Sequence, residues 1–296
     1  MPTVHLIDAS PYIFRAYYSI PASMKSPDGN VTNAIYGYTE FLIQVLKREK
    51  PTHLAVAFDG SLTTSFRNEI YPQYKAQRGL PPPELEAQLE ACRRMTHALG
   101  MVSFVDDRFE SDDLIGTLVR QLREQDAHCV IISSDKDFAQ LVDDEVVVWD
   151  FARDVRYDAR AVQEKFGVAP NQIVDLLALM GDSVDNVPGI KGVGPKTAGL
   201  LLAHFGSLEA IYAGLERVAH LPVRGAKSLR DKLEAGREMA TLSRQLVTIA
   251  TDVQLQAEIA RLRYDGARRT AVVPVLETLG FSHTKDRIPF WALADE

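Results

Sequence analysis

Short apolar runs alternate with helix-like patterns over residues 1–165, and this alternation constrains the fold more than any other feature of the sequence. Five runs have the length and content of strands, at Val4–Ile7, His53–Phe58, Met101–Val105, Val130–Ser133 and Val146–Trp149. Four stretches have the apolar period of helices, at Ala34–Lys47, Leu85–Leu99, Asp112–Glu124 and Asp137–Leu141. Strands alternating with helices form parallel sheets covered by helices. We therefore expect an α/β fold built on a mainly parallel sheet.

Acidic residues stand at the ends of three of these apolar runs. Asp8, Asp59 and Asp135 occupy these positions. In open α/β sheets the carboxyl ends of the strands lie at one edge, where ligands bind. A single aspartate at a strand end is commonly a turn or capping residue. Capping alone does not explain three of them at one edge, so we expect these side chains to face a shared site.

Further acids lie at two helix starts and in one short loop. They are Glu110, Asp112, Asp113, Asp137, Asp182 and Asp185. Carboxylates crowded into one pocket repel one another, and hard cations such as Mg²⁺ or Mn²⁺ relieve that repulsion. Acids at a helix start also have a plain alternative role, because they interact favourably with the helix dipole. Taken together, the acids predict a divalent-metal site.

The composition is that of an ordinary globular protein. The chain has 296 residues, of which 46% are hydrophobic and 25% charged, enough for one large domain or two modest ones. We expect neither a membrane span, which needs about 20 apolar residues, nor a signal peptide. Cys92 and Cys129 stand alone, and we expect buried free thiols in a reducing cytoplasm. The seven histidines show no zinc-binding spacing.

Charge is unevenly distributed along the chain. The net charge is −7, but Asn186–Gln245 holds nine Lys or Arg and five Asp or Glu, which leaves −11 for the remainder. A basic segment joined to an acid-rich one suits a protein that binds phosphates with one part and metal with another.

Strand signals fade after about Pro170, and helices dominate. The expected helices are Ile173–Leu179, Lys196–His204, Ser207–Tyr212, Ala226–Ala235 and Glu238–Ile249. After about Asp252 we expect one short strand and then a helix near Ala271–Leu279. This region is predicted to be a smaller helical unit beside the sheet.

A glycine-rich hairpin at Gly189–Ala198 leads into one of these helices. Gly192 and Gly194 permit a tight turn, and the first turn of the helix, with Lys196 and Thr197, offers free N–H groups to a phosphate. Lys191 adds positive charge. We expect sequence-independent binding to a nucleic-acid backbone, with a plain helix–turn–helix connection as the alternative. Loop carbonyls in this hairpin are also candidates for a K⁺ site. The turn at Leu221–Lys227 is a second candidate phosphate contact, and a plain turn explains it equally well.

The stretch Ser61–Pro83 has no clean apolar period, and we expect a partly helical excursion over the acidic edge. It contains Arg67, Tyr71, Tyr74, Lys75 and Arg78. Aromatic residues interleaved with cations suit single-stranded nucleic acid, which stacks on rings and pairs its phosphates with cations. The alternative is a solvated basic loop with buried tyrosines. Arg15, on the first helix after Asp8, is a further candidate phosphate contact or a plain surface residue.

Several motifs together resemble the bacterial 5′-nuclease (flap endonuclease) family, and most of all the 5′→3′ exonuclease domain at the N-terminus of DNA polymerase I. The matching stretches are Leu6–Ser10, Phe58–Gly60, Tyr74–Arg78, Glu110–Asp113, Ser134–Asp137, Met180–Gly189 and Gly192–Ala198. They occur in family order and span roughly residues 3–255. One departure is Ala9, which stands where glycine is common and removes no ligand.

The resemblance implies a PIN-like nuclease core at residues 1–169 with a helical arch at about 61–84. It further implies a helix–three-turn–helix DNA-binding region of the helix-hairpin-helix type at 170–255. We expect the remaining residues, 256–296, to pack on the core as an extension.

The resemblance also implies roles for individual residues. Two divalent ions would be held, one by Asp8, Asp59, Glu110 and Asp112, the other by Asp135, Asp137, Asp182 and Asp185, with Asp113 contributing nearby. Lys75 and Arg78 would steer the scissile phosphate. The expected DNA contacts are Arg15, Tyr74, Lys75, Arg78, Lys191, Gly192, Gly194, Lys196 and Thr197. The expected substrate is DNA with 5′ ends or 5′ flaps, bound without sequence preference by a monomer during Okazaki fragment processing and repair.

Three other functions are compatible with parts of the pattern. An aspartyl phosphatase would need a second aspartate two residues after Asp8, where Ser10 stands. A PIN-type ribonuclease would lack the glycine-rich hairpin and the arch. An inactive DNA-junction binder would have no use for the clustered carboxylates, which would only destabilise the fold.

Overall fold

A six-stranded sheet forms the centre of the structure, a computed structural model that describes residues 1–61, 63–222 and 225–293. The strands are β1 (Thr3–Asp8), β2 (His53–Asp59), β3 (Val102–Asp106), β4 (His128–Ile132), β5 (Val146–Asp150) and β6 (Val155–Tyr157). Their order is β3-β2-β1-β4-β5-β6, and every pairing is parallel except that of β5 with β6. The predicted α/β fold with a mainly parallel sheet is confirmed.

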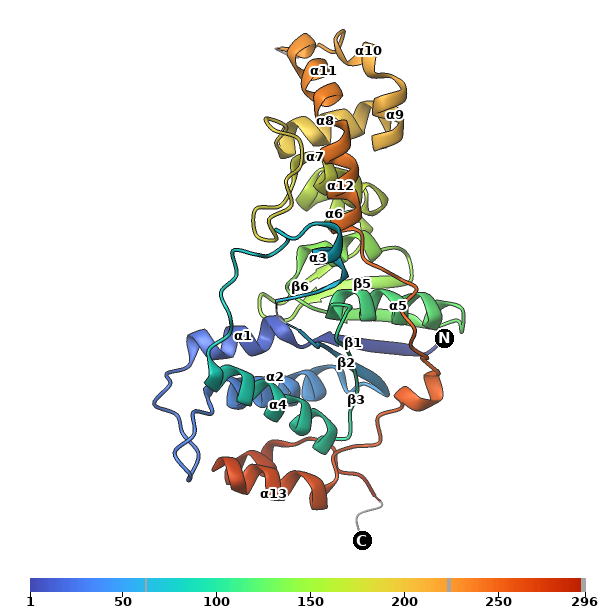
Figure 1. Cartoon of the computed structure of the whole chain (residues 1–296). Helices are drawn as coiled ribbons and strands as arrows, with labels where there is room; N and C mark the ends of the chain where they lie inside the picture. The colour runs from blue at the N-terminus through green and yellow to red at the C-terminus, as the bar shows by residue number, and fades with distance from the viewer. Residues whose placement is uncertain (62, 223–224, 294–296) are drawn as a thin grey trace.

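Helices cover both faces of this sheet (Figure 1). On one face lie α1 (Ser10–Ser19), α2 (Asn33–Glu49) and α4 (Pro83–Ala98), and on the other lies α5 (Ser111–Arg123). Successive residues of β1 point to opposite faces, so that Leu6 packs with the α5 side and Ile7 with the α2 side. Both side chains are fully buried. Burial on both faces explains why the strands consist of continuous apolar runs instead of alternating patterns.

The helical region extends away from the α5 face of the sheet (Figure 1). It contains α6 (Ala159–Phe166), α7 (Ile173–Met180), α8 (Pro195–Phe205), α9 (Leu208–Ala213), α10 (Leu215–Val218), α11 (Ala226–Ala235) and α12 (Arg237–Val247). The buried apolar side chains of these helices continue into the core beneath α5, so the region is not isolated from the sheet. Helix α12 packs along α7 and returns the chain toward the sheet.

Several predicted elements differ from the observed ones. The stretch predicted as a helix at Asp137–Leu141 is a 3₁₀ helix, η1 (Lys136–Leu141), and a second 3₁₀ turn, η2 (Pro170–Gln172), precedes α7. Strand β6 and helix α6 were not predicted. β6 has only three residues, two of them exposed, so it carries no apolar pattern.

The strand predicted after Asp252 is wrong. Residues 252–268, all within the described part, contain one 3₁₀ turn, η3 (Ile259–Leu262), and isolated bridges at Arg263 and Ala267. The helix expected near Ala271–Leu279 is present as α13 (Arg269–Leu279), followed by η4 (Ser282–Arg287). Helix α13 packs against α4, with Val272 and Leu276 buried.

The excursion between β2 and α4 lies across the carboxyl edge of the sheet. It contains one short helix, α3 (Phe66–Ile70), followed by turns, so it is partly helical as predicted. Lys75 N donates to Asp185 O over 3.0 Å, and Asn186 Nδ2 donates to Gln73 O over 2.7 Å. These bonds attach the excursion to the acidic loop that follows α7.

The prediction of buried free thiols agrees with the structure. Cys92, in α4, and Cys129, in β4, are buried free thiols. Within the residues described, no helix combines the length and apolar character required to cross a membrane.

Candidate metal centre and nucleic-acid interface

Asp8 and Asp59 end the neighbouring strands β1 and β2 at the carboxyl edge of the sheet. Asp8 is 4% exposed and accepts hydrogen bonds from Ser111 Oγ (2.9 Å) and Ser133 Oγ (2.8 Å). Asp59 accepts from Ser111 N (2.8 Å) and from the Ser10 hydroxyl. Burial and the neighbouring charge of Asp59 raise the pKa of Asp8 to about 7. The two carboxylates are therefore oriented by hydroxyl and amide donors while they repel each other.

A first acid cluster lies at the N-terminus of α5. Carboxylate oxygens of Glu110, Asp112 and Asp113 lie within 4.8 Å of one another. Glu110 is the N-cap residue of α5, and Lys75 Nζ lies 2.6 Å from its Oε1. Burial opposes ionisation of Glu110, but Lys75 and Arg67 together lower its pKa. Burial and the charge of Asp113 raise the pKa of Asp112 well above its usual range.

A second acid cluster joins η1 to the loop after α7. Oxygens of Asp137, Asp182 and Asp185 lie within 4.8 Å of one another, and Asp135 Oδ1 accepts from Asp137 N over 2.9 Å. Lys136 Nζ lies 2.6 Å from Asp182 Oδ2. Burial and the charge of Asp135 raise the pKa of Asp137. The buried atom Asp137 Oδ1 has no hydrogen-bond partner, which is costly for a carboxylate unless a cation binds it.

Asp113 differs from the other acids because its acceptor positions are already filled. Its two oxygens accept from Arg67 Nη1 and Nη2, each over 2.8 Å, from Glu110 N over 3.1 Å and from Ala250 N over 2.8 Å. A carboxylate offers about four lone-pair positions. Asp113, which is fully buried, lies beside the first cluster but has no oxygen lone pair left for a metal ion.

A cavity of about 600 Å³ lies against the first cluster and reaches Asp135, which is hydrogen-bonded to Asp137 of the second cluster. Acids and the two arch cations line it: Asp8, Asp59, Glu110, Asp112, Asp135, Lys75 and Arg78. Phe14, Leu80 and Pro81 form part of an apolar wall. Five of the nine predicted metal ligands thus line the cavity, three more form the second cluster beside Asp135, and Asp113 lies behind the first cluster. The cavity is large enough for a phosphodiester together with ions.

The excursion between β2 and α4, which is the predicted arch, places Lys75 and Arg78 at this cavity. Arg78 Nη2 lies 2.5 Å from Asp185 Oδ1, and Lys75 Nζ lies 3.7 Å from Asp185 Oδ2. Lys75 has a left-handed backbone, with φ of 53°. The same turn that attaches its N–H to Asp185 O therefore directs its ammonium group toward Glu110 and the first cluster.

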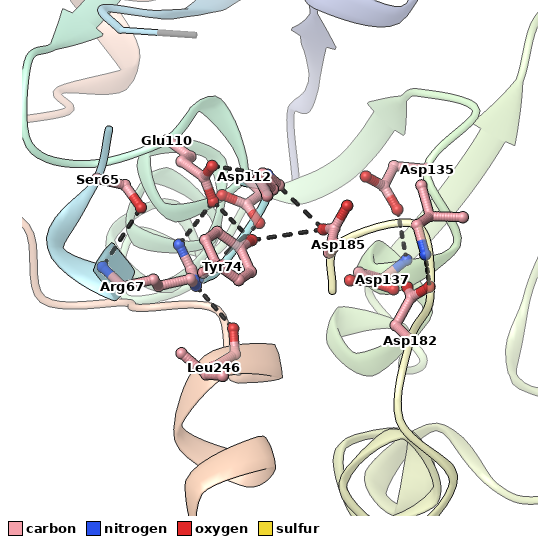
Figure 2. Close-up of polar contacts among 12 residues, drawn as sticks. Ser65, Arg67, Tyr74, Glu110, Asp112, Asp135, Asp137, Asp182, Asp185 and Leu246 are labelled. Carbon is pink, nitrogen blue, oxygen red and sulfur yellow. Dashed lines mark hydrogen bonds and ion pairs between the residues drawn. The ribbon is translucent and has the colours of Figure 1, made fainter. Parts of the chain in front are cut away.

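Two other arch residues do not lie where a nucleic-acid contact would need them. Tyr74 is 3% exposed, and its hydroxyl lies 3.0 Å from Glu110 Oε2 and 3.4 Å from Asp185 Oδ2 (Figure 2). Its ring is not available for stacking on a base. Arg67, in α3 of the arch, is 1% exposed, and its guanidinium group lies between Asp113 of α5 and Leu246 of α12. Both side chains bind acids of the site instead, so stacking by Tyr74 and a phosphate contact by Arg67 remain predictions that this geometry does not support.

The glycine-rich hairpin has the predicted tight geometry. Gly189 has φ of 59°, and a Cβ atom there would lie 2.3 Å from Gly181 N. Gly192 has φ of 83°, and Pro195 starts α8. The first N–H groups of an α-helix have no partner within the helix, so those of Lys196 and Thr197 are available to an anion. In front of Gly194, no heavy atom lies within 4 Å of a Cβ position.

The remaining candidate contacts lie on the surface. Lys191 and Lys196 are exposed, and neither forms an ion pair with an acid in the described part of the chain. Arg15 is exposed on α1 and does not line the cavity. The candidate turn at Leu221–Lys227 includes residues 223 and 224, which lie outside the described residues.

Several residues of the site were missed by the sequence analysis. Ser10, Ser111 and Ser133 orient Asp8 and Asp59, and Lys136 pairs with Asp182. Each stands within two residues of a predicted acid, which is a usable signal. Gln140 and Leu246–Ala250, described below, have no such signal.

Two family models together match most of the chain. A family model described as "5′-3′ exonuclease, N-terminal resolvase-like domain" matches residues 3–167, and one described as "5′-3′ exonuclease, C-terminal SAM fold" matches residues 168–270. DNA polymerase I of Pseudomonas aeruginosa is 43% identical over 282 residues, which are 95% of this chain and 31% of that protein. DNA polymerase I of Bacillus subtilis is 36% identical over 96% of this chain and 32% of its own length. The chain spans about a third of these relatives.

Solved structures show the same fold. The 5′-exonuclease of bacteriophage T5 with bound zinc has a TM-score of 0.68 at 23% identity and covers 94% of this chain and 99% of its own. The T5 D15 flap endonuclease in a pseudo-enzyme-product complex with DNA and metal ions has a TM-score of 0.68 at 22% identity, with 96% and 97% covered. The catalytic core of Rad2 with DNA substrate has a TM-score of 0.65 at 17% identity, with 96% and 90% covered. The predicted PIN-like architecture with an adjoining helical region is confirmed as a fold.

Proposed function

The chain belongs to the 5′-3′ exonuclease family, and from this premise we propose that it hydrolyses DNA phosphodiester bonds near 5′ ends and at 5′ flaps. The observation that carries the proposal is the cavity at the carboxyl edge of the sheet. The two cations that line it, Lys75 and Arg78, lie between the acid clusters: Lys75 is near Glu110 of the first and Asp185 of the second, and Arg78 pairs with Asp185.

The donor set of this cavity fits two divalent ions. All candidate ligands are carboxylate oxygens, which Mg²⁺ and Mn²⁺ prefer, and Asp137 Oδ1 is a buried oxygen without a donor. Asp8, Asp59, Glu110 and Asp112 would hold one ion, and Asp135, Asp137, Asp182 and Asp185 the other. When bound, such ions would supply an activated water and neutralise the charge that develops on the leaving oxygen.

The chain's own groups orient and neutralise the scissile phosphate. Lys75 and Arg78 reach the cavity from the same turn of the arch, and both carry positive charge that offsets charge on the phosphoryl oxygens. Ser10, Ser111 and Ser133 fix the carboxylates of Asp8 and Asp59 by hydrogen bonds. The apolar wall beside Leu80 limits the number of waters that share the cavity. No serine or cysteine nucleophile is part of the proposal.

The hairpin before α8 would bind duplex DNA through its backbone. Its exposed lysines and free first-turn N–H groups recognise phosphates and no base, so affinity would fall with salt and would not depend on sequence. A K⁺ ion held by hairpin carbonyls would add positive charge near the same phosphates. The arch would select a single-stranded 5′ end. We propose that the chain acts as a monomer in Okazaki fragment processing and DNA repair in the bacterial cytoplasm.

The proposal is tested with a labelled 5′-flap duplex incubated with Mg²⁺ or with EDTA. We expect Mg²⁺-dependent cuts at or near the flap junction and short products from the 5′ end. A flap of the same sequence made of RNA, and a blunt duplex, serve as matched controls. An RNA flap cut faster than the DNA flap would support the ribonuclease alternative, and binding without any cut would support the inactive junction binder.

A further inference from the structure

The end of helix α12 contacts the residues that support both acid clusters. Its last residues and the segment that follows, Leu246–Ala250, lie against α3, α5 and η1. Figure 2 shows Leu246 below Arg67, with the first cluster on the far side of the guanidinium group. A single side chain, that of Arg67, therefore lies between the backbone of Leu246 and the candidate metal ligand Glu110.

Arg67 links this segment to the first cluster and uses all of its side-chain N–H donors. Nε donates to Leu246 O (2.7 Å) and Nη2 to Thr248 O (3.1 Å). Nη1 donates to Glu110 Oε2 (2.9 Å), and the two terminal nitrogens bind Asp113 bidentately. An arginine has five N–H groups in a fixed planar arrangement, and all five are used here. This side chain therefore fixes the distance between α12 and the ligand Glu110.

Gln140 connects the same segment to η1, the element that carries Asp137 of the second cluster. Its Nε2 donates to Val247 O and its Oε1 accepts from Ile249 N, both over 3.0 Å. Gln140 lies in η1, the 3₁₀ helix that also carries Asp137. The backbone groups of residues 246–250 therefore alternate between Arg67 and Gln140, and Asp113 binds the last of them through Ala250 N.

The packing leaves no room for this segment to shift. A Cβ atom at Gly116 on α5 would lie 2.5 Å from Ile249 Cγ2 and 3.0 Å from Ala250 O, so glycine is required at this approach. In the same helix, four residues before its end, Ser243 Oγ accepts from Gly189 N of the hairpin over 2.9 Å. One helix consequently connects the hairpin to both clusters.

We propose that Leu246–Ala250, with Arg67, Asp113 and Gln140, forms a brace that couples the seating of the DNA-binding helices to the geometry of both metal sites. Arg67, Asp113 and Gln140 are positioning residues in this brace: Arg67 is not a phosphate contact, and Asp113 is not a metal ligand. The inference depends on the proposed metal-dependent function. Because coupling between sites is reciprocal, metal binding at the clusters stabilises the brace as the brace stabilises the sites.

The first test uses the unmodified protein and hydrogen exchange with and without Ca²⁺. We expect exchange of the amides at residues 246–250 to slow about 10-fold on Ca²⁺ addition, within the usual range of coupling between sites. Amides of α11 serve as the internal control and should not change. Protection confined to residues near the acids, with unchanged exchange at 246–250, would overturn the brace.

The second test compares substitutions by Ca²⁺ titration calorimetry, flap binding in Ca²⁺ and steady-state cleavage in Mg²⁺. Arg67→Lys keeps the charge but has only three donors, and we expect about 10-fold weaker Ca²⁺ binding and about 100-fold lower kcat with KM changed less than about 3-fold. Gln140→Leu should weaken Ca²⁺ binding in the same direction by a smaller factor, and it remains informative if Arg67→Lys fails to fold. Arg120→Lys is the matched control, because Arg120 also links α5 to the residue that follows this segment, through Thr251 O, but on the exposed side. It should leave binding and cleavage unchanged.

A double substitution separates a positioning role from metal ligation by Asp113. If both residues act through one contact, Arg67→Lys with Asp113→Asn should be no worse in Ca²⁺ affinity than the more severe single variant. Additive losses would assign Asp113 a separate ligand role and contradict the proposal. Loss of thermal stability with unchanged Ca²⁺ affinity and kcat would reduce the contact to a structural one. If the unmodified protein does not cleave flap DNA, the proposed function fails first.

Discussion

The acidic edge and the glycine-rich hairpin both bind charge, but they are built in opposite ways. At the edge, carboxylates from distant parts of the chain are buried together, and the pKa of Asp8 rises to about 7 because burial and Asp59 disfavour its charge. At the hairpin, Lys191 and Lys196 are exposed and have no acidic partner among the described residues. At the edge, the carboxylates repel one another until a cation binds, whereas the hairpin presents positive charge directly to a phosphate.

This difference predicts that the acidic edge governs catalysis and that the hairpin governs DNA affinity. The edge exists only when strands, α5, η1 and the loop after α7 are all in place, so substitutions there should change catalysis. The hairpin is formed by consecutive residues, so substitutions there should change DNA binding or local stability. The predictions below test that separation, from the largest expected effect to the smallest.

Asp182→Ala should have the largest effect. It removes a carboxylate of the second cluster and leaves Lys136 without its partner. We expect Mg²⁺-dependent cleavage of a 5′ flap to fall at least about 1,000-fold, because the site loses a ligand for an ion that stabilises charge in the transition state. Flap binding in Ca²⁺ should persist within a few-fold. Cleavage at the original rate would contradict the metal assignment.

Gly189→Ala should destabilise the hairpin strongly. A Cβ atom there would clash with the backbone of Gly181, and the left-handed φ is unfavourable for alanine as well. We expect a loss of about 2–4 kcal/mol of unfolding free energy, measured by denaturant titration. Gly206→Ala is the matched control, because its φ of 91° is also left-handed but no heavy atom lies within 4 Å of its Cβ position. It should cost only about 1–2 kcal/mol. Equal losses would show that steric contact at Gly189 contributes nothing.

Lys196→Glu should weaken DNA binding about 10-fold for every sequence alike, because it removes one phosphate contact and adds a repulsive charge. The rate at saturating DNA should stay the same. Binding measured over a range of salt concentrations should show a shallower slope. Lys47→Glu, the same change on the exposed side of α2, is the control. A loss limited to particular sequences would argue against recognition of the backbone.

Tyr74→Phe should have the smallest effect and decides between two roles for this ring. The hydroxyl lies between Glu110 and Asp185, so its removal should reduce kcat about 3-fold by loosening both clusters. Affinity for single-stranded flaps should not change, because the ring is buried. A stacking role predicts the reverse, with weaker binding and unchanged kcat, and Tyr71→Phe provides a control on the same arch.

Much of the sheet could be predicted because its strands are buried on both faces. The four central strands, β1, β2, β4 and β5, are mainly apolar and buried, and the acids at strand ends follow from the direction of the chain. The wrong or missing elements are those without such burial. β6 has three residues, and the strand expected after Asp252 has no sheet edge to pair with beyond isolated bridges.

The arch illustrates what a local pattern cannot resolve. Arg67, Tyr74, Lys75 and Arg78 look alike in sequence, as basic and aromatic residues of one polar segment. Lys75 and Arg78 reach the cavity, while Arg67 and Tyr74 are buried beneath it. The difference arises from contacts with α5, α12 and the loop after α7, which are remote in sequence.

The sequence by itself determined the set of acids and the edge at which they meet, because short apolar runs indicate the position, direction and burial of the strands. Only the tertiary structure decided which of those acids keep a free oxygen. Asp112 and Asp113 are neighbours on α5, yet Asp113 alone is saturated, by Arg67 and by Ala250 N, partners 46 and 137 residues away in the chain. Hydrogen-bond capacity is limited to a few lone pairs per carboxylate, so distant partners, and not the residue type, assign each acid to metal binding or to support.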